Sequence, residues 1–244
     1  MTWPRELIAV RHGESVANAA FAAAHGPDRD DVRVDGPDWA VALTDLGRRQ
    51  AVRLGGHLAT LGDRIDVVFT STYQRARETT SLALGELCRL TTQAPPILTD
   101  ERLRDRELGI LELRSRAEIA RDLPDEVARR GQLGEFYYRP PAGESFPDVI
   151  ARVRAFVGDL RQSWQGKRVL VVGHDAVVLM LRYVIEGMTP EQVMVAEPVR
   201  NAGITRWSAS RRGVRLAGYN ETSHLDDLDL EPEKADPNPE IVTI

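Results

Sequence analysis

The sequence predicts an α/β fold, a three-layer sandwich with a mostly parallel central sheet and helices on both faces. Short apolar runs alternate with longer amphipathic segments along the 244 residues, which is typical of strands and helices in such sheets. Two of the apolar runs end directly in polar residues, Arg11-His12-Gly13 and Gly173-His174. Ligands of open α/β sheets bind at the carboxyl ends of the strands, so this edge is expected to hold the site.

The expected elements follow from apolar spacing and from capping residues. Thr44 and Ser145 each precede an amphipathic run, and Ser145 with Asp148 resembles a capping box. Ser15 or Asn18 is expected to cap a first helix, and Pro124 to break or kink the helix over 115–130. The expected strands are 7–10, 66–70, 97–98, 168–172 and a hairpin of 204–208 with 214–219; the other expected helices are 44–61, 75–87, 145–160 and 177–185.

Two segments lack periodicity. Residues 21–43 are rich in Asp, Gly, Pro and Ala, and predict a long loop with one helical turn. Such a loop after a catalytic strand is either a substrate wall or lid, or a solvated insertion, and the sequence leaves both open. Residues 1–221 are expected to form one domain, and the acidic residues 222–244 a poorly ordered tail.

Composition excludes several classes of protein. The net charge of −5 argues against a nucleic-acid binder or a membrane-surface binder. Cys88 is the single cysteine, so a disulfide framework and a cysteine metal cluster are both excluded. The chain starts without a charged segment followed by a long apolar run, and no run approaches a membrane span. We therefore expect a cytoplasmic protein.

Three predicted strand ends bring cations and imidazoles to one edge of the sheet. Two histidines and two arginines in one pocket favour a doubly charged anion, because guanidinium groups bind phosphate oxygens in a bidentate manner. The arginines would repel a cation, and no spacing fits a known metal site, so neither metal nor cofactor is expected. The residues concerned are Arg11, His12 and Gly13, Ser71 with Arg75, and Gly173 with His174.

These motifs resemble those of the histidine phosphatase superfamily, the phosphoglycerate-mutase-like fold. The resemblance covers residues 5 to about 219 in the family's order, which makes residues 1–221 the catalytic domain. The matching blocks are Arg11-His12-Gly13-Glu14-Ser15 with Asn18, residues 43–51, Ser71 to Ala76 with Thr79, Pro141-Ala142-Gly143-Glu144-Ser145, Val172-Gly173-His174, and Asn201 before the last core strands.

The resemblance implies that His12 attacks a phosphate monoester and forms a phosphohistidine, which water then hydrolyses. Arg11, Arg75 and His174 would bind the equatorial phosphoryl oxygens. They also disfavour a proton on His12, whose ordinary pKa is about 6.5, so we expect a neutral imidazole. Further expected substrate contacts are Ser15, Asn18, Glu107, Glu144 and Asp175; Asp175 stands where many members have a small residue and is expected to orient a side chain or restrict the pocket.

A carboxylic acid must protonate the leaving oxygen, and the sequence offers two candidates. The family's block has the acid four residues before a glycine, which selects Asp105, four before Gly109. Glu107 is the reserve candidate, because this block departs from the usual family pattern. To donate a proton near neutral pH, the acid needs a pKa raised by burial or by the charge of the bound phosphate.

Three functions stay open, in a definite order. The preferred one is a phosphatase of small phosphorylated metabolites, acting as a monomer or a homodimer. The second is a phosphoglycerate mutase, disfavoured because residues 131–141 have only Arg139 and two tyrosines instead of a Trp-Arg-Arg-Ser-Tyr pattern. The third is a non-catalytic phosphate-binding module, disfavoured because no nucleophile or arginine is lost. The sequence does not specify the substrate.

Overall fold

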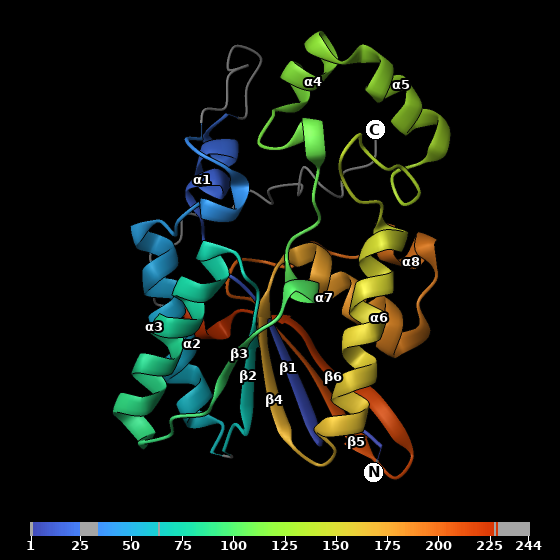
Figure 1. The fold of residues 1–244 in the computed structure, drawn as a ribbon. Helices are drawn as coiled ribbons and strands as arrows, with labels where there is room; N and C mark the ends of the chain where they lie inside the picture. Colours follow the sequence, from blue (N-terminus) through green and yellow to red (C-terminus); the bar gives the residue numbers. More distant parts are fainter. Residues whose placement is uncertain (1, 25–33, 63, 227, 229–244) are drawn as a thin grey trace.

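A mixed six-stranded sheet forms the centre of the protein (Figure 1). The computed structural model describes residues 2–24, 34–62, 64–226 and 228. The strand order is β3-β2-β4-β1-β5-β6, in which the first four strands run parallel and β5 and β6 pair antiparallel. The strands are β1 Glu6–Arg11, β2 Val67–Thr70, β3 Ile97–Thr99, β4 Arg168–Gly173, β5 Ile204–Ser210 and β6 Gly213–Glu221. The predicted strands and the mostly parallel sheet are confirmed.

Helices cover both faces of the sheet, which confirms the three layers (Figure 1). One face carries α2, Asp45–Thr60, and α3, Gln74–Thr91, which lie on the left of the figure. The other carries α6, Phe146–Ser163, and α7, Asp175–Arg182, on the right. A π-helical turn, Tyr183–Gly187, extends α7 and leads to the short α8, Pro190–Met194.

Each face of the sheet has its own apolar core, because side chains alternate along a strand. In β1, Leu7 and Ala9 pack on the α6 and α7 side, whereas Ile8 and Val10 pack on the α2 and α3 side. The central strand β4 divides in the same way between the two cores. All residues of β4 are buried, as expected for a strand covered on both faces.

The helices begin at the predicted caps. Thr44 accepts a hydrogen bond from the Gly47 N–H at the start of α2, and Ser145 forms the expected capping box with Asp148 at α6. Both candidates for the first cap take part: Ser15 and Asn18 form a capping box at α1, Val16–Ala23. The caps fix where α1 leaves the end of β1.

Two helices and two 3₁₀ turns cover the carboxyl edge of the sheet. Pro124 divides the helix predicted over 115–130 into α4, Arg116–Asp122, and α5, Pro124–Leu133, as expected of a residue without an N–H group. These helices lie beyond the carboxyl edge of the sheet, at the top of Figure 1. The turns η2, Glu101–Leu103, and η3, Gly109–Leu111, connect β3 to α4.

The aperiodic segments hold more structure than expected. Helix α1 reaches Ala23, and the helical turn predicted in the following loop is η1, Asp38–Ala40. Residues 25–33 of this loop lie outside the described residues, as do 227 and 229–244 of the acidic tail. The described start of the tail forms the turn η5, Ser223–Leu225, whose Leu225 is buried, so packed chain continues past residue 221. Within the described part of the chain, no helix combines the length and apolar character that crossing a membrane requires.

Two glycines let helix α2 press against the loop that follows β1. A Cβ added to Gly47 would lie 2.0 Å from the carbonyl oxygen of Glu14, and one added to Gly13 would lie 2.4 Å from the carbonyl oxygen of Gly47. Both distances are shorter than any side-chain carbon tolerates against backbone. This close contact therefore sets the position of the loop that carries His12.

We expect Gly47→Ala to lower the free energy of unfolding by about 1–3 kcal/mol, because the new methyl group must displace backbone. The control is Gly56→Ala in the same helix, where a Cβ meets nothing within 4 Å. Since alanine favours helix, the control is expected to raise stability by about 0.5–1 kcal/mol. Urea denaturation measures both; a Gly47→Ala variant as stable as the control would contradict the contact.

Candidate active site

The pocket lies at the carboxyl ends of β1, β2 and β4, between η1, η3 and the start of α1. Of the residues that the sequence singled out, seven line it: Arg11, His12, Ser15, Asn18, Arg75, Asp105 and Asp175. It is also lined by Asp38, Glu112 and Arg114, which the sequence did not single out. Phe21 and Asp38 come from the 21–43 loop, so the described part of that loop is a pocket wall.

His12 presents an unprotonated nitrogen to Arg75. Its Nδ1 lies 2.7 Å from the carbonyl oxygen of Gly13, an atom that only accepts, so Nδ1 carries the proton and donates. The Nε of Arg75 donates to Nε2 at 3.2 Å, which requires a lone pair on Nε2. This assignment of the tautomer follows from the contacts. Nε2 is therefore the nucleophilic atom of the pair.

The surroundings of His12 keep its imidazole neutral. Burial is the largest cause, and the charges of Arg75, His174 and Arg11 act in the same direction, so the pKa of His12 lies well below its ordinary value. The sequence predicted the effect of the three charges. It did not show the burial, which leaves His12 only 2% exposed.

Arg75 uses every N–H group of its guanidinium, which has five. Besides the bond to His12, Nη1 donates to the carbonyl oxygen of Asp38 at 2.7 Å and to its Oδ1 at 3.0 Å. Nη2 donates to Asp38 Oδ2 at 3.0 Å and to Asp105 Oδ2 at 2.7 Å. The carboxylate of Asp38 thus binds in the bidentate manner of a phosphate. A phosphoryl group can bind Arg75 only by displacing one of these acceptors.

Arg11 keeps one donor for a ligand. Its Nη1 donates to the carbonyl oxygen of Val199 at 2.7 Å. Its Nε is buried and has no hydrogen-bond partner among the described residues. The N–H of Val199 donates to Asp175 Oδ1 at 3.0 Å. Arg11 therefore binds the carbonyl group of Val199, and Asp175 binds its N–H group. Asp175 therefore orients backbone beside the pocket.

His174 lies beside His12 and Asp105 but is not among the residues that line the pocket. Its ring lies fully buried at the N-cap of α7 and packs edge-on to His12, with 5.2 Å between ring centroids. Its Nδ1 lies 3.0 Å from Asp105 Oδ2, and its Nε2 lies 2.9 Å from the hydroxyl oxygen of Ser71. Both nitrogens face protein groups, so His174 orients Asp105, and the binding of a phosphoryl oxygen by His174 stays a prediction.

Asp105 is a carboxylate in this site. Burial raises its pKa, but the contacts with His174 and with the permanently charged Arg75 outweigh burial and hold the pKa well below its ordinary value. The sequence analysis expects burial or the charge of a bound phosphate to raise the pKa of the proton donor, and burial alone does not do so at Asp105.

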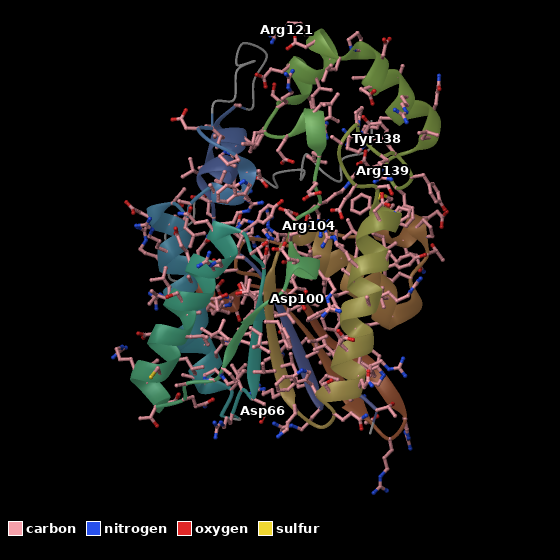
Figure 2. The ribbon with its side chains drawn as sticks, viewed as in Figure 1. Asp66, Asp100, Arg104, Arg121, Tyr138 and Arg139 are labelled. Carbon is pink, nitrogen blue, oxygen red and sulfur yellow. The ribbon has the colours of Figure 1, made fainter. Side chains whose placement is uncertain are left out.

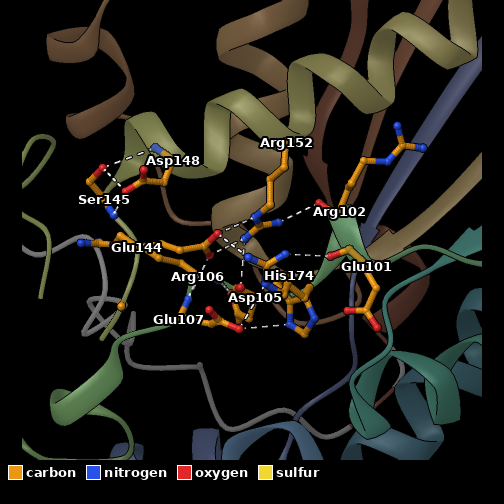
Figure 3. A network of polar contacts seen from close by, with 12 residues as sticks. Glu101, Arg102, Asp105, Arg106, Glu107, Glu144, Ser145, Asp148, Arg152 and His174 are labelled. Carbon is orange, nitrogen blue, oxygen red and sulfur yellow. Dashed lines mark hydrogen bonds and ion pairs between the residues drawn. The ribbon is translucent and has the colours of Figure 1, made fainter. Parts of the chain in front are cut away.

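Glu144 and Glu107 are not among the residues that line the pocket, although the sequence analysis expects them to contact substrate. Figure 3 shows Glu144 in a polar network with Arg152. The carboxylate of Glu144 accepts hydrogen bonds from Arg104 at 2.7 Å and from Arg152 Nε at 3.0 Å. Arg152 Nη2 also donates to the backbone oxygen of Asp105 at 2.9 Å. Glu107 is half-exposed and pairs with Arg104. Glu144 thus holds Arg152, which in turn fixes the backbone of Asp105.

Ser15 and Asn18 shape the rim of the pocket. The side-chain oxygen of Asn18 accepts hydrogen bonds from the N–H and the hydroxyl of Ser15, at 3.1 and 2.9 Å. Asn201 donates to the same Asn18 oxygen and to the backbone oxygen of His12, both at 3.1 Å. These bonds tie the start of α1 to the end of β1.

The sequence pattern did not identify Asp38 and Glu112 as pocket residues. Asp38 lies in an aperiodic loop, and Glu112 ends a charged run whose plainest interpretation is a solvated surface. In the structure, Glu112 lines the pocket and accepts a hydrogen bond from the Leu108 N–H at 2.9 Å. Burial and the charge of Asp38 raise the pKa of Glu112 to about 7. Only the three-dimensional contacts show these properties.

Three of these side chains could ligate a cation. Within the described ranges, His12, Asp105 and His174 each offer a ligand atom, and these atoms lie within 4.8 Å of one another. The guanidinium of Arg75 already donates to the lone pair of His12 and to Asp105, so a cation would face a fixed positive charge. The donor set fits an anion site, and metal-independent activity stays a prediction.

Residues 7–222 match the family model of the histidine phosphatase superfamily, branch 1. The chain belongs to this superfamily. It is 31% identical over 205 residues to a 2,3-bisphosphoglycerate-dependent phosphoglycerate mutase of Nitrobacter winogradskyi, covering 82% of this chain and 90% of the relative. It is 33% identical over 193 residues to the mutase of that name from Methylobacterium radiotolerans, covering 78% of this chain and 82% of the relative.

Solved structures with this fold include phosphatases of the superfamily. The chain superposes on Bacillus stearothermophilus YhfR with a TM-score of 0.73 and 25% identity, covering 91% of this chain and 99% of the other. A mycobacterial glucosyl-3-phosphoglycerate phosphatase gives a TM-score of 0.69 and 25% identity, covering 89% of this chain and 100% of the other. The superfamily and fold predicted from the motifs are confirmed. The named matches of this chain include both mutases and phosphatases.

We expect His12→Ala to lower turnover by about 10³-fold or more, because it removes the group that forms the covalent intermediate. Rapid quenching with a labelled phosphate monoester should trap an acid-labile phosphoenzyme in the wild type and none in the variant. Thermal unfolding checks that the variant keeps its fold. An acid-labile phosphoenzyme in His12→Ala would show that another residue is the nucleophile.

We expect Asp38→Asn to lower the inhibition constant of orthophosphate by about tenfold, since a hydrogen bond between charged groups is worth about 1.5–3 kcal/mol. The variant keeps the shape of Asp38 but removes the charge that competes for Arg75. Asp35→Asn is the matched control, because Asp35 lies exposed on the same loop. Equal inhibition constants in both variants would show that Asp38 does not compete with phosphate.

Proposed function

We propose that the protein is a phosphatase that hydrolyses phosphate monoesters of small metabolites through a phosphohistidine on His12. The charge balance of the pocket carries this proposal. Three arginines and three aspartates line the described pocket, and His12 is neutral: Arg11, Arg75 and Arg114 against Asp38, Asp105 and Asp175. The pocket has no excess of fixed positive charge for a second phosphate.

A single phosphoryl group suits this balance. It takes the place of the Asp38 carboxylate on Arg75 and accepts the free Nε donor of Arg11. Because one anion takes the place of another, the guanidinium of Arg75 keeps a negatively charged partner throughout. A bisphosphorylated intermediate needs a second cationic group, and Arg114 already pairs with Asp122 at 3.4 Å.

The segment that sets mutases apart by sequence does not reach the pocket here. Tyr138 and Arg139 lie beyond the sheet, beneath α4 and α5 (Figure 2). The hydroxyl of Tyr138 donates to Glu126 at 2.7 Å. Arg139 donates to the backbone oxygen of Gly143 at 3.0 Å and lies near Asp148. Neither residue lines the pocket, so this segment supports α5 and its connection to α6.

The geometry supports the following steps. Nε2 of His12 attacks phosphorus in line, the P–N bond forms, and the bond from phosphorus to the ester oxygen breaks. Arg75 and Arg11 stabilise the charge on the equatorial oxygens. The leaving oxygen takes a proton, the alcohol departs, and water then attacks the phosphohistidine. Phe21, Leu108 and Leu111 line the pocket and suit a leaving group with a carbon skeleton.

Mutase activity is the second candidate, because relatives 31% and 33% identical to this chain are named as mutases. The two functions are separated with 3-phosphoglycerate and a 2,3-bisphosphoglycerate primer, in buffer with EDTA. We expect isomerisation to be slow or absent, and phosphate release from a panel of phosphorylated metabolites to be faster. Isomerisation faster than any phosphate release would reverse the assignment. Activity that returns only with added metal would contradict the metal-independent mechanism.

A further inference from the structure

We propose that residues 36–40 form a strap that closes the phosphate position of the pocket and opens when a phosphoryl group binds. The carboxylate of Asp38 is the internal ligand that the phosphoryl group displaces from Arg75. The proposal rests on the proposed phosphatase function and adds a conformational step to it. Three observations carry it: the position of Asp38 on Arg75, the few contacts that hold the strap, and the burial of the Arg75 charge.

The carboxylate of Asp38 lies on the same guanidinium that contacts the nucleophile. Arg75 donates from Nη1 to Oδ1 and from Nη2 to Oδ2, both at 3.0 Å, and its Nε donates to Nε2 of His12 at 3.2 Å. Guanidinium groups make this two-pronged contact with carboxylates and with phosphates alike. A phosphoryl group within reach of both His12 Nε2 and Arg75 would therefore meet the Asp38 carboxylate. The strap has to move before the reacting groups can come together.

The strap is held to the rest of the protein mainly by this contact. Among the described residues, every hydrogen bond from residues 36–40 to another segment goes to Arg75, including the bond from Nη1 to the backbone oxygen of Asp38 at 2.7 Å. The bonds that close η1 are internal to residues 37–41. Pro37 lies exposed, and Trp39 is 61% exposed. A segment with few buried apolar contacts opens at low cost.

Both ends of the strap allow such a movement. At one end, Gly36 has a φ of 82° and open space around its Cβ position, a conformation that glycine adopts without strain. At the other end, Val41 is buried, and the backbone oxygen of Ala42 accepts a hydrogen bond from the Val16 N–H at 3.0 Å. The strap can therefore turn about Gly36 while the chain from Val41 onward keeps its place beside α1.

The buried charge of Arg75 explains what the strap does. A buried guanidinium is costly to leave without an anion, and Asp38 supplies that anion when no phosphate is bound. A phosphoryl dianion takes over this role and repels the displaced carboxylate, which drives the strap outward. As orthophosphate leaves, Asp38 competes for Arg75 and favours release of the product. The strap thus exchanges one anion for another at the reaction centre.

Trp39 reports on the strap, because it directly follows Asp38. The other tryptophans, Trp3, Trp164 and Trp207, pack in or against the core on the α6 and α7 side. Saturating orthophosphate is expected to shift the tryptophan emission of the wild type to longer wavelength, since an opened strap exposes Trp39 further. Trp39→Phe should lose this shift. Calorimetry measures phosphate binding by the same proteins.

Asp38→Asn tests whether the carboxylate closes the strap. Its emission is expected to start near the phosphate-saturated value of the wild type and to lose most of the phosphate-dependent shift, because the amide does not hold Arg75 as an ion pair. Asp35→Asn is the matched control on the same loop and should respond as the wild type does. Circular dichroism shows whether each variant is folded.

Proteolysis gives a second readout. Chymotrypsin cuts after tryptophan, and opening of the strap exposes the bond after Trp39. Phosphate should therefore speed the cut between residues 39 and 40 in the wild type, although a ligand that only stabilised the fold would slow it. Asp38→Asn should be cut at the faster rate without phosphate. Mass spectrometry identifies the site of the cut.

The outcomes separate the strap from the proposed function. Phosphate that binds by calorimetry without shifting the emission of Trp39 would overturn the strap alone, as would slower cutting after Trp39 when phosphate is present. An Asp38→Asn variant that responds as the wild type does would also overturn it. If the wild type binds no orthophosphate and hydrolyses no phosphate monoester, the proposed function fails, and the strap fails with it.

Discussion

The buried guanidinium of Arg75 is the group on which the site depends. It is only 4% exposed and cannot lose its charge, so folding requires an acceptor for each of its N–H groups. His12 supplies a lone pair, and Asp38 and Asp105 supply carboxylates. The same contacts fix the tautomer of His12 and keep Asp105 ionised. One cation thereby prepares the nucleophile, orients a carboxylate and provides the place where a phosphoryl group binds.

Two further sets of contacts hold the surroundings of Arg75 in place. The contact between Gly13 and Gly47 presses α2 against the loop that follows β1, and the capping box of Ser15 sets the direction of α1. On the other side, Arg152 and Glu144 fix the backbone of Asp105 (Figure 3). Buried ion pairs contribute little net stability, because desolvation offsets their attraction. Their value here is in holding a carboxylate where Arg75 and His174 both reach it.

Asp105 and Glu112 have contrasting surroundings. Against the effect of burial, His174 and Arg75 hold the pKa of Asp105 well below its ordinary value, whereas burial and the charges of Asp38 and Asp105 raise the pKa of Glu112 to about 7. The surroundings thus move the pKa values of the two carboxyl groups in opposite directions. The pocket's three aspartates balance its three arginines, which is the observation that supports the proposed phosphatase function.

The sequence by itself determined the layers of the fold and the nucleophile. Alternating apolar runs identify strands buried on both faces, and polar residues directly after them must lie at the carboxyl edge, so Arg11, His12 and Arg75 were predictable. It did not determine the roles of Glu144 and Glu107, because a motif does not show which arginines bind these carboxylates. Asp38 lies in an aperiodic loop and Glu112 at the end of a charged run, and burial and neighbouring charge define their surroundings. Tertiary structure alone decided these, because burial and the distance between charges arise only once distant segments pack together.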